Sequence, residues 1–233
     1  MRKWGLFILL LLVLTGCRST PFDGHSVIDW IDFIKWDGIE YNGIYSGVLA
    51  DEKYIGEKLG TVKYKVADNV TNPNYKIRNG DAAFHEKGTE IFAIIGRPYL
   101  IAVKDASQIN GYRVYYSRDG IDQKWHFHNV PLDKVNKVEI YQPYTTEGNK
   151  LLSNYTNREE FTPLLQLLEN SEESPNFQPN MEKGDPVHFH IVLYTDEPIA
   201  YQYNVQYDGT TYFWFPWDTE ILSNDIETFL KGK

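Results

Sequence analysis

Residues 187–215 read VHFHIVLYTDEPIAYQYNVQYDGTTYFWF, and this stretch decides the fold of the second half of the chain. Apolar residues occupy every other position from Val187 to Leu193, and the same alternation continues from Ile199 to Tyr207. Side chains two positions apart on a strand share one face, so the pattern predicts consecutive strands over 187–194, 199–207 and 210–215. The dipeptide Asp208-Gly209 predicts a two-residue hairpin turn into the third strand.

Two amphipathic segments flank these strands and predict helices over 157–170 and 218–230. In the first, Asn157 followed by Glu160 resembles a capping box, and Pro163 leaves two alternatives, a kink or a start at Thr162. In both segments the apolar residues recur at helical spacing. They are Phe161, Leu164, Leu165 and Leu168 in the first, and Leu222, Ile226, Phe229 and Leu230 in the second.

The first half of the chain contains many short segments of β-type composition, separated by turn signals. Asp-Gly and Asn-Gly dipeptides recur along the chain and tolerate the positive φ angles of tight turns, which favours an antiparallel meander. The segments cover residues 33–41, 60–66, 89–95, 99–103 and 111–116.

These patterns predict an α+β fold that is dominated by strands in antiparallel sheets and divided into two small modules. Residues 33–118 form the small β-rich module, and residues 119–134 are the boundary region. Residues 135–233 form the α+β module, with the order strand, helix, three strands, helix.

The N-terminus carries a membrane-targeting pattern. Arg2 and Lys3 precede eleven uncharged residues, 4–14, which are too few to span a bilayer as a helix because that takes about 20 apolar residues. Leu14, Thr15, Gly16 and Cys17 follow directly and resemble the lipobox of bacterial lipoproteins. The alternatives are an ordinary secretory signal followed by a chance cysteine, or an uncleaved membrane helix.

The lipobox resemblance implies that residues 1–16 are a signal peptide and that Cys17 carries a diacylglycerol group. Residues 17–32 are then the lipidated N-terminus and tether. Each buried CH₂ contributes about 0.8 kcal/mol, so two acyl chains hold stably where one holds marginally. The whole chain resembles small surface lipoproteins of Gram-positive bacteria, which implies the extracytoplasmic face of the cell membrane; in a Gram-negative cell the same lipobox implies a periplasmic leaflet.

Composition agrees with an exported, acidic body. Cys17 is the only cysteine, and a lipidated cysteine cannot form a disulfide, so the fold must be stable without cross-links. Removal of residues 1–16 takes away Arg2 and Lys3 but no acid, so the net charge moves from −9 to −11. An acidic surface repels nucleic acid and anionic polymers, which excludes nucleic acid as an expected partner.

Two His-x-His pairs, His126 with His128 and His188 with His190, are the candidate metal ligands. Each pair on a strand would offer two imidazoles from one face to zinc or copper. The alternative is structural, because matching the apolar faces of strands 187–194 and 199–207 places His188 and His190 beside Gln202 and Asn204 on the more solvated face.

The aromatic run at residues 212–217 is the second candidate site. Tyr212, Trp214 and Trp217 could form an exposed platform for sugar rings or for a protein partner. The alternative is that the predicted closing helix covers this face.

No catalytic template is present. The sequence contains no Gly-x-Ser-x-Gly elbow, no His-Glu-x-x-His and no phosphate-binding glycine loop, and the single cysteine is the lipidation candidate. The leading hypothesis is therefore a non-enzymatic envelope lipoprotein that binds a protein or polymer partner or acts in structural display, without a required cofactor. The alternatives are a metal-binding or metal-delivery lipoprotein and a hydrolase of envelope polymers.

Overall fold

The computed structural model describes residues 28–117 and 126–232. The predicted signal peptide, Cys17, the tether up to residue 27 and boundary residues 118–125 lie outside the described residues. Within the described ranges, strands dominate and helices are few, which confirms the predicted strand-dominated character. These ranges contain no helix that is long and apolar enough to cross a membrane.

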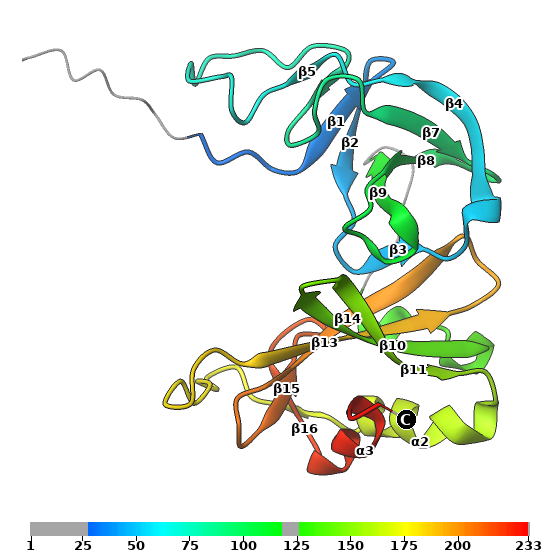
Figure 1. The fold of residues 1–233 in the computed structure, drawn as a ribbon, viewed down its shortest axis with the longest axis vertical. Coiled ribbons are helices and arrows are strands. Elements are labelled where there is room, and N and C mark those ends of the chain that lie inside the picture. Colours follow the sequence, from blue (N-terminus) through cyan, green and yellow to red (C-terminus); the bar gives the residue numbers. More distant parts are fainter. Residues whose placement is uncertain (1–27, 118–125, 233) are drawn as a thin grey trace, which may run out of the picture.

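The upper body in Figure 1, here called the N-terminal module, is a sheet with the strand order β4-β7-β8-β9-β2-β1-β6-β5. The sheet curls and brings the Trp36 indole of β1 directly against Gly60 of β4, where an added Cβ would overlap the ring. Its strands are β1 (Phe33–Trp36), β2 (Ile39–Gly43), β4 (Ile55–Thr61), β5 (Tyr64–Lys65), β6 (Asp81–Ala82), β7 (Glu90–Ile94), β8 (Arg97–Lys104) and β9 (Tyr112–Ser117), with 3₁₀ helices η1 (Glu52–Tyr54) and η2 (Ile109–Gly111).

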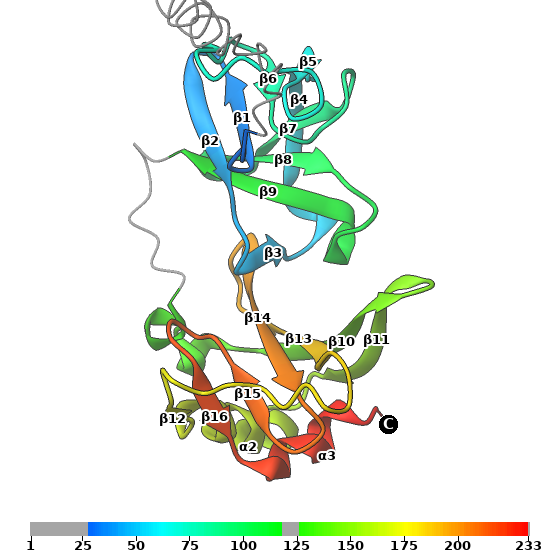
Figure 2. The ribbon, with the colours of Figure 1, turned by 90° about the vertical axis from the view of Figure 1, so that its left-hand side faces the viewer.

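The lower body, the C-terminal module, is a sheet with the order β11-β10-β13-β14-β15-β16-β12, and its helices lie on one face (Figure 2). Its strands are β10 (Lys137–Thr145), β11 (Gly148–Tyr155), β12 (Glu172–Glu173), β13 (Val187–Tyr194), β14 (Ile199–Tyr207), β15 (Tyr212–Trp214) and β16 (Glu220–Leu222). Its helices are η3 (Phe127–Asn129), η4 (Leu132–Lys134), α2 (Arg158–Glu169), η5 (Asn224–Ile226) and α3 (Glu227–Leu230).

The predicted strands 187–194 and 199–207 are confirmed as β13 and β14, and the odd-numbered residues pair with each other, as in Ile191 with Tyr203. The prediction of a two-residue turn at Asp208-Gly209 is wrong, because β15 begins only at Tyr212. Asp208 forms a longer turn instead, closed by a hydrogen bond from its backbone N–H to the Thr211 carbonyl. In the N-terminal module the predicted strand 33–41 is two strands, because Asp37 and Gly38 both adopt positive φ.

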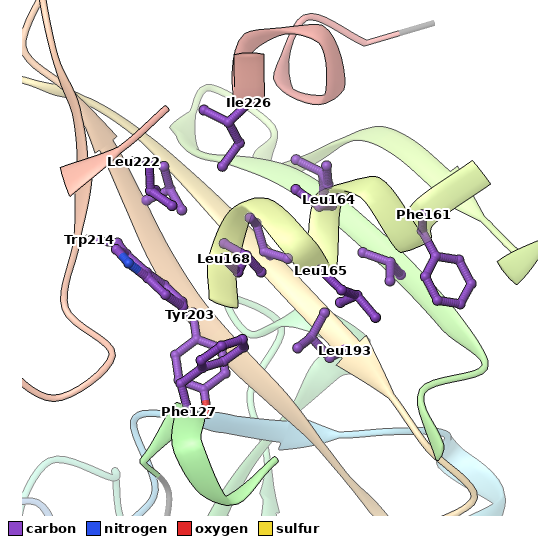
Figure 3. Close-up of a cluster of buried hydrophobic side chains, with 14 of the residues drawn as sticks. Phe127, Phe161, Leu164, Leu165, Leu168, Leu193, Tyr203, Trp214, Leu222 and Ile226 are labelled. Atoms are coloured by element: carbon purple, nitrogen blue, oxygen red, sulfur yellow. The ribbon is translucent and has the colours of Figure 1, made fainter. Parts of the chain in front are cut away.

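Helix α2 confirms the first predicted helix. Asn157 caps it by accepting a hydrogen bond from the Glu159 N–H, and the helix begins at Arg158 and continues through Pro163, so the alternative start at Thr162 is wrong. All four residues of its apolar stripe are buried and pack onto the odd-numbered face of β13 and β14 (Figure 3). The stripe therefore places the main core of the C-terminal module between α2 and the sheet.

The predicted closing helix over 218–230 is wrong. Residues 220–222 form β16, in which Leu222 pairs with Tyr212, and Ser223 then caps η5, so only Glu227–Leu230 are α-helical. The apolar pattern nevertheless identified core residues correctly, since Leu222, Ile226 and Leu230 are all buried. Backbone pairing with β15 overrides the helical preference, because β15 would otherwise leave its outer N–H and C=O groups unpaired.

One strand of the N-terminal half links the two modules. Strand β3 (Gly47–Leu49) comes from the N-terminal half and pairs with β14 of the C-terminal module, Leu49 opposite Ile199. Two apolar clusters also combine residues of both halves. A shared strand and shared core join the modules tightly, so the space between them is preformed.

Candidate functional site

His126 and His128 lie beside η3. The His126 Nδ1 accepts a hydrogen bond from the His128 N–H at 3.2 Å, and the His126 ring stacks on Trp217 with the centroids 5.1 Å apart. The two imidazole centroids are 5.5 Å apart. Phe127 between them points into the core against Tyr203 and Trp214, so this pair belongs to the side of the sheet that α2 covers.

His188 and His190 project from the opposite face of β13, beside Asn204, as expected. The side chain of Asn204 contacts the His188 Nδ1 at 3.1 Å. His190 is half-buried: burial, with a smaller effect of His188, lowers its pKa to about 4, and its Nδ1 is buried without a hydrogen-bond partner. Its face is still the more solvated one, since Ile191 and Leu193 on the other face are fully buried, and Tyr141 of β10 lies opposite His190 in the sheet.

The four histidines do not come together. They lie on opposite faces of the sheet, and among residues 28–117 and 126–232 no group of three or more His, Cys, Asp or Glu side chains is arranged to hold a metal ion. Each pair offers at most two imidazoles, which leaves most of a zinc coordination sphere unfilled.

The aromatic run is mostly core. Trp214 is fully buried and Tyr212 nearly so, and both belong to the cluster under α2. The predicted exposed platform is wrong for these two residues, because they lie opposite Tyr207 and Val205 and continue the apolar face of β14. Trp217, just beyond β15, is 77% exposed, and Phe215 is 51% exposed. Within the run 212–217, the exposed aromatic surface is thus confined to Phe215 and Trp217.

A cleft of about 880 Å³ lies where the modules meet. Its walls come from three separate segments, the β7–β8 hairpin, the 131–136 segment that contains η4, and the β13–β14 hairpin. Its lining comprises Gly96, Arg97, Pro98, Tyr99, Leu100, Pro131, Lys134, Asn136, Thr195, Asp196, Glu197, Ile199 and Tyr201.

Polar contacts fix the walls of this cleft relative to one another. Arg97 of the N-terminal module forms an ion pair with Glu197 of the C-terminal module. The Asn136 Nδ2 donates to the Asp196 Oδ1 at 2.9 Å, and the Tyr54 hydroxyl donates to the Asp196 carbonyl at 3.1 Å. Lys134 is exposed and has no ion-pair partner among the described residues.

A buried carboxylate holds the modules together close to the cleft. Glu139 of β10 accepts hydrogen bonds from the hydroxyls of Tyr194 and Tyr141 and from the Lys137 ammonium. Burial by itself raises the pKa of Glu139, but these donors outweigh it and hold the pKa below its ordinary value. Asn110 of the N-terminal module donates to the Tyr194 hydroxyl at 3.2 Å, so the network spans both modules.

A second buried network lies inside the N-terminal module. Asp32 pairs with Arg113 at 3.0 Å and accepts from the Tyr115 hydroxyl at 2.8 Å, and that hydroxyl contacts the His85 Nε2 at 2.6 Å. Since Tyr115 donates to the carboxylate, it accepts from His85, whose pKa burial lowers. The network joins the first described residues to β9.

The cleft offers binding groups rather than a catalytic set. Its lining contains no histidine, cysteine or serine, and its acids, Asp196 and Glu197, are neighbours on one turn and already bonded. The sequence patterns missed every cleft residue, because each segment alone is an ordinary polar turn. Comparisons of the chain with protein-family models, with curated proteins and with solved structures found no match.

Proposed function

We propose that this protein is a lipid-anchored surface protein of the bacterial cell envelope that binds a ligand non-covalently in the cleft between its modules. The lipobox at residues 14–17 supports the anchor, although it lies outside the described residues. The cleft of about 880 Å³ is the observation that carries the binding function, because ligand sites in proteins are commonly preformed clefts of 300–1,000 Å³ at domain junctions, as a rough range.

The rigidity of the junction supports binding over structural display. The β3–β14 pairing, the shared cores and the Arg97–Glu197 ion pair keep the walls in place without a ligand. A preformed site loses little conformational entropy on binding, so contacts in it convert efficiently into affinity.

The proposal is tested by filling the cleft with a bulky side chain and measuring whether ligand binding is lost. In Asn136→Trp an indole replaces an exposed cleft-lining amide, and Asn154→Trp adds the same bulk on exposed β11 as the matched control. Thermal unfolding of the mature lipidated chain in detergent is followed with neutral oligosaccharides, poly(glycerol phosphate) and short peptides. A ligand at 100 times its Kd should stabilise the native chain by about 2.7 kcal/mol.

We expect a stabilising compound to lose its effect on Asn136→Trp and to keep it on Asn154→Trp. A compound that stabilises both variants equally binds elsewhere and contradicts the cleft assignment. If no compound of the three classes stabilises the native chain, structural display becomes the better account.

Metal binding remains a second candidate, on the observation that the imidazole centroids of His126 and His128 are 5.5 Å apart. Two imidazoles bound to one ion through nitrogens about 2.0 to 2.1 Å from it lie at a comparable spacing. Copper(II) bound there would quench the fluorescence of the stacked Trp217, and excess zinc at the same site would displace the copper and restore the emission; His126→Ala with His128→Ala would abolish the quenching. Quenching that persists in that double variant, or is absent in the native chain, rejects this candidate.

A further inference from the structure

We infer that the cleft ligand is an uncharged oligosaccharide; this inference rests on the proposed function and specifies its ligand class. The argument uses the charges, the aromatic surface and the hydrogen-bonding groups of the cleft lining.

The charges of the lining balance. Arg97 and Lys134 supply two positive charges, and Asp196 and Glu197 supply two negative charges. A charged ligand would be attracted by the two side chains of opposite sign and repelled by the two of like sign. The lining therefore selects no ionic ligand by Coulomb interaction. An anionic polymer is also repelled by the whole body, whose net charge is negative.

A wholly apolar ligand fits the lining no better. Four charged side chains and the Asn136 amide border the space, and apolar atoms placed over them would remove water from these groups without replacing its hydrogen bonds. That desolvation costs about 1–3 kcal/mol for each unsatisfied group. The lining therefore favours a ligand that presents hydrogen-bonding groups around its whole rim.

The cleft lining also contains an exposed aromatic ring that can stack on a sugar. Tyr99 lines the cleft beside Arg97 and is 49% exposed, so its ring is open to a ligand. A pyranose ring has an apolar C–H face that stacks on a phenol ring and a rim of hydroxyls that bond to amides, carboxylates and guanidinium groups. The combination of Tyr99, Asn136 and the Arg97–Glu197 pair matches both parts of such a ring.

A second exposed aromatic ring lies outside the cleft lining. Trp217 is 77% exposed and stacks on the His126 ring. The experiment therefore tests this ring separately from the cleft.

The experiment is calorimetric titration of the mature lipidated chain in detergent with chitotetraose and maltotetraose as neutral probes. Poly(glycerol phosphate) and a neutral peptide serve as comparison probes. For the sugar that binds, we expect Tyr99→Ala to weaken affinity about 10-fold, equivalent to 1.4 kcal/mol, and Asn136→Ala to weaken it at least about 5-fold. Tyr144→Ala, which removes a ring that is 83% exposed and does not belong to the cleft lining, is the matched control.

Binding of an uncharged sugar should also be insensitive to salt between about 50 and 500 mM. If poly(glycerol phosphate) or the peptide binds and depends on Asn136 while neither sugar binds, the oligosaccharide inference fails and the proposed binding function stands. Sugar binding that survives Tyr99→Ala and Asn136→Ala but is lost in Trp217→Ala overturns the cleft as its site. If no probe binds, both proposals fail.

Discussion

At the scale of single residues, the Asp208 carboxylate accepts four hydrogen bonds from two segments of the chain. One oxygen of its carboxylate accepts from the N–H groups of Thr210 and Thr211 and from the Thr210 hydroxyl, and the other accepts from the Asn180 N–H. Burial by itself raises the pKa of Asp208, but these donors outweigh it and lower the pKa to about 2. The side chain thus fixes the β14–β15 turn and attaches the loop around Asn180 to it.

Asp208→Ala should lower the free energy of unfolding by about 2–3 kcal/mol at pH 7, because it removes hydrogen bonds to a charged acceptor. The folded pKa lies below the unfolded value of about 3.9, so the contribution is complete above the unfolded pKa and is lost as pH falls through about 2. Urea unfolding at pH 7 and pH 3 measures it, with exposed Asp185→Ala as control. Equal losses in both variants would contradict this role.

The half-buried His190 also makes the free energy of unfolding fall as the pH is lowered, in a higher pH window than Asp208. Its folded pKa of about 4 lies below the unfolded value, so the unfolded chain takes up a proton between pH 6.5 and 4 while the folded chain does not. His190 therefore costs stability as pH falls through this window, whereas leucine there would not.

We expect His190→Leu to gain about 1–2 kcal/mol relative to the native chain when the pH is lowered from 7 to 5. His128→Leu, at an exposed position, is the control. Urea unfolding of the three proteins at both pH values gives the comparison. A pH response of His190→Leu equal to that of the native chain would show that the pKa of His190 is the same in the folded and the unfolded chain.

At the scale of elements, the three-residue strand β3 joins the two modules. Its Val48 is buried against Val192, Tyr194 and Ala200 of the C-terminal module, although three residues of extended chain have no stability of their own. The strand therefore exists because β14 and the surrounding apolar residues hold it.

Val48→Asp should place an unpaired carboxylate in this cluster and loosen the module junction, at a cost of at least about 3 kcal/mol. Hydrogen exchange should then speed up at residues 199–201 of β14, which pair with β3, and stay slow in α2. Leu151→Asp, on half-exposed β11, should change neither. Uniformly faster exchange throughout the chain would instead mean global destabilisation.

At the scale of the whole molecule, the anchor and the cleft define the proposed role together. Two acyl chains on Cys17 would keep the body at the membrane surface, and the short tether would keep the cleft near envelope polymers. The acidic body would stay in solution next to the anionic surface rather than bind it by charge.

Cys17→Ala should abolish lipid labelling and either release the protein from the membrane fraction or leave an unprocessed precursor, because no other thiol is available to accept the lipid. Cell fractionation with radiolabelled palmitate, alongside Ser19→Ala as a neighbouring control, gives the measurement. Unchanged labelling of Cys17→Ala would refute the anchor.

Local periodicity in the sequence was enough to predict β13, β14 and α2. In β13 and β14 the period of two and in α2 the period of 3.6 each produce one apolar face, and the register followed because a slip by one residue would expose Ile191 and Tyr203. The Asn157 cap was also predictable, since it depends on residues next to it in the chain.

Tertiary structure alone decided β3, β16 and the cleft. Residues 220–222 have helical spacing but form a strand, because the free edge of β15 offers backbone hydrogen bonds that a helix would leave unused. Arg97, Asn136 and Glu197 belong to three polar segments that meet only after β3 joins the modules. Local sequence sets which face of an element is apolar, whereas contacts between distant segments depend on where those faces are finally buried.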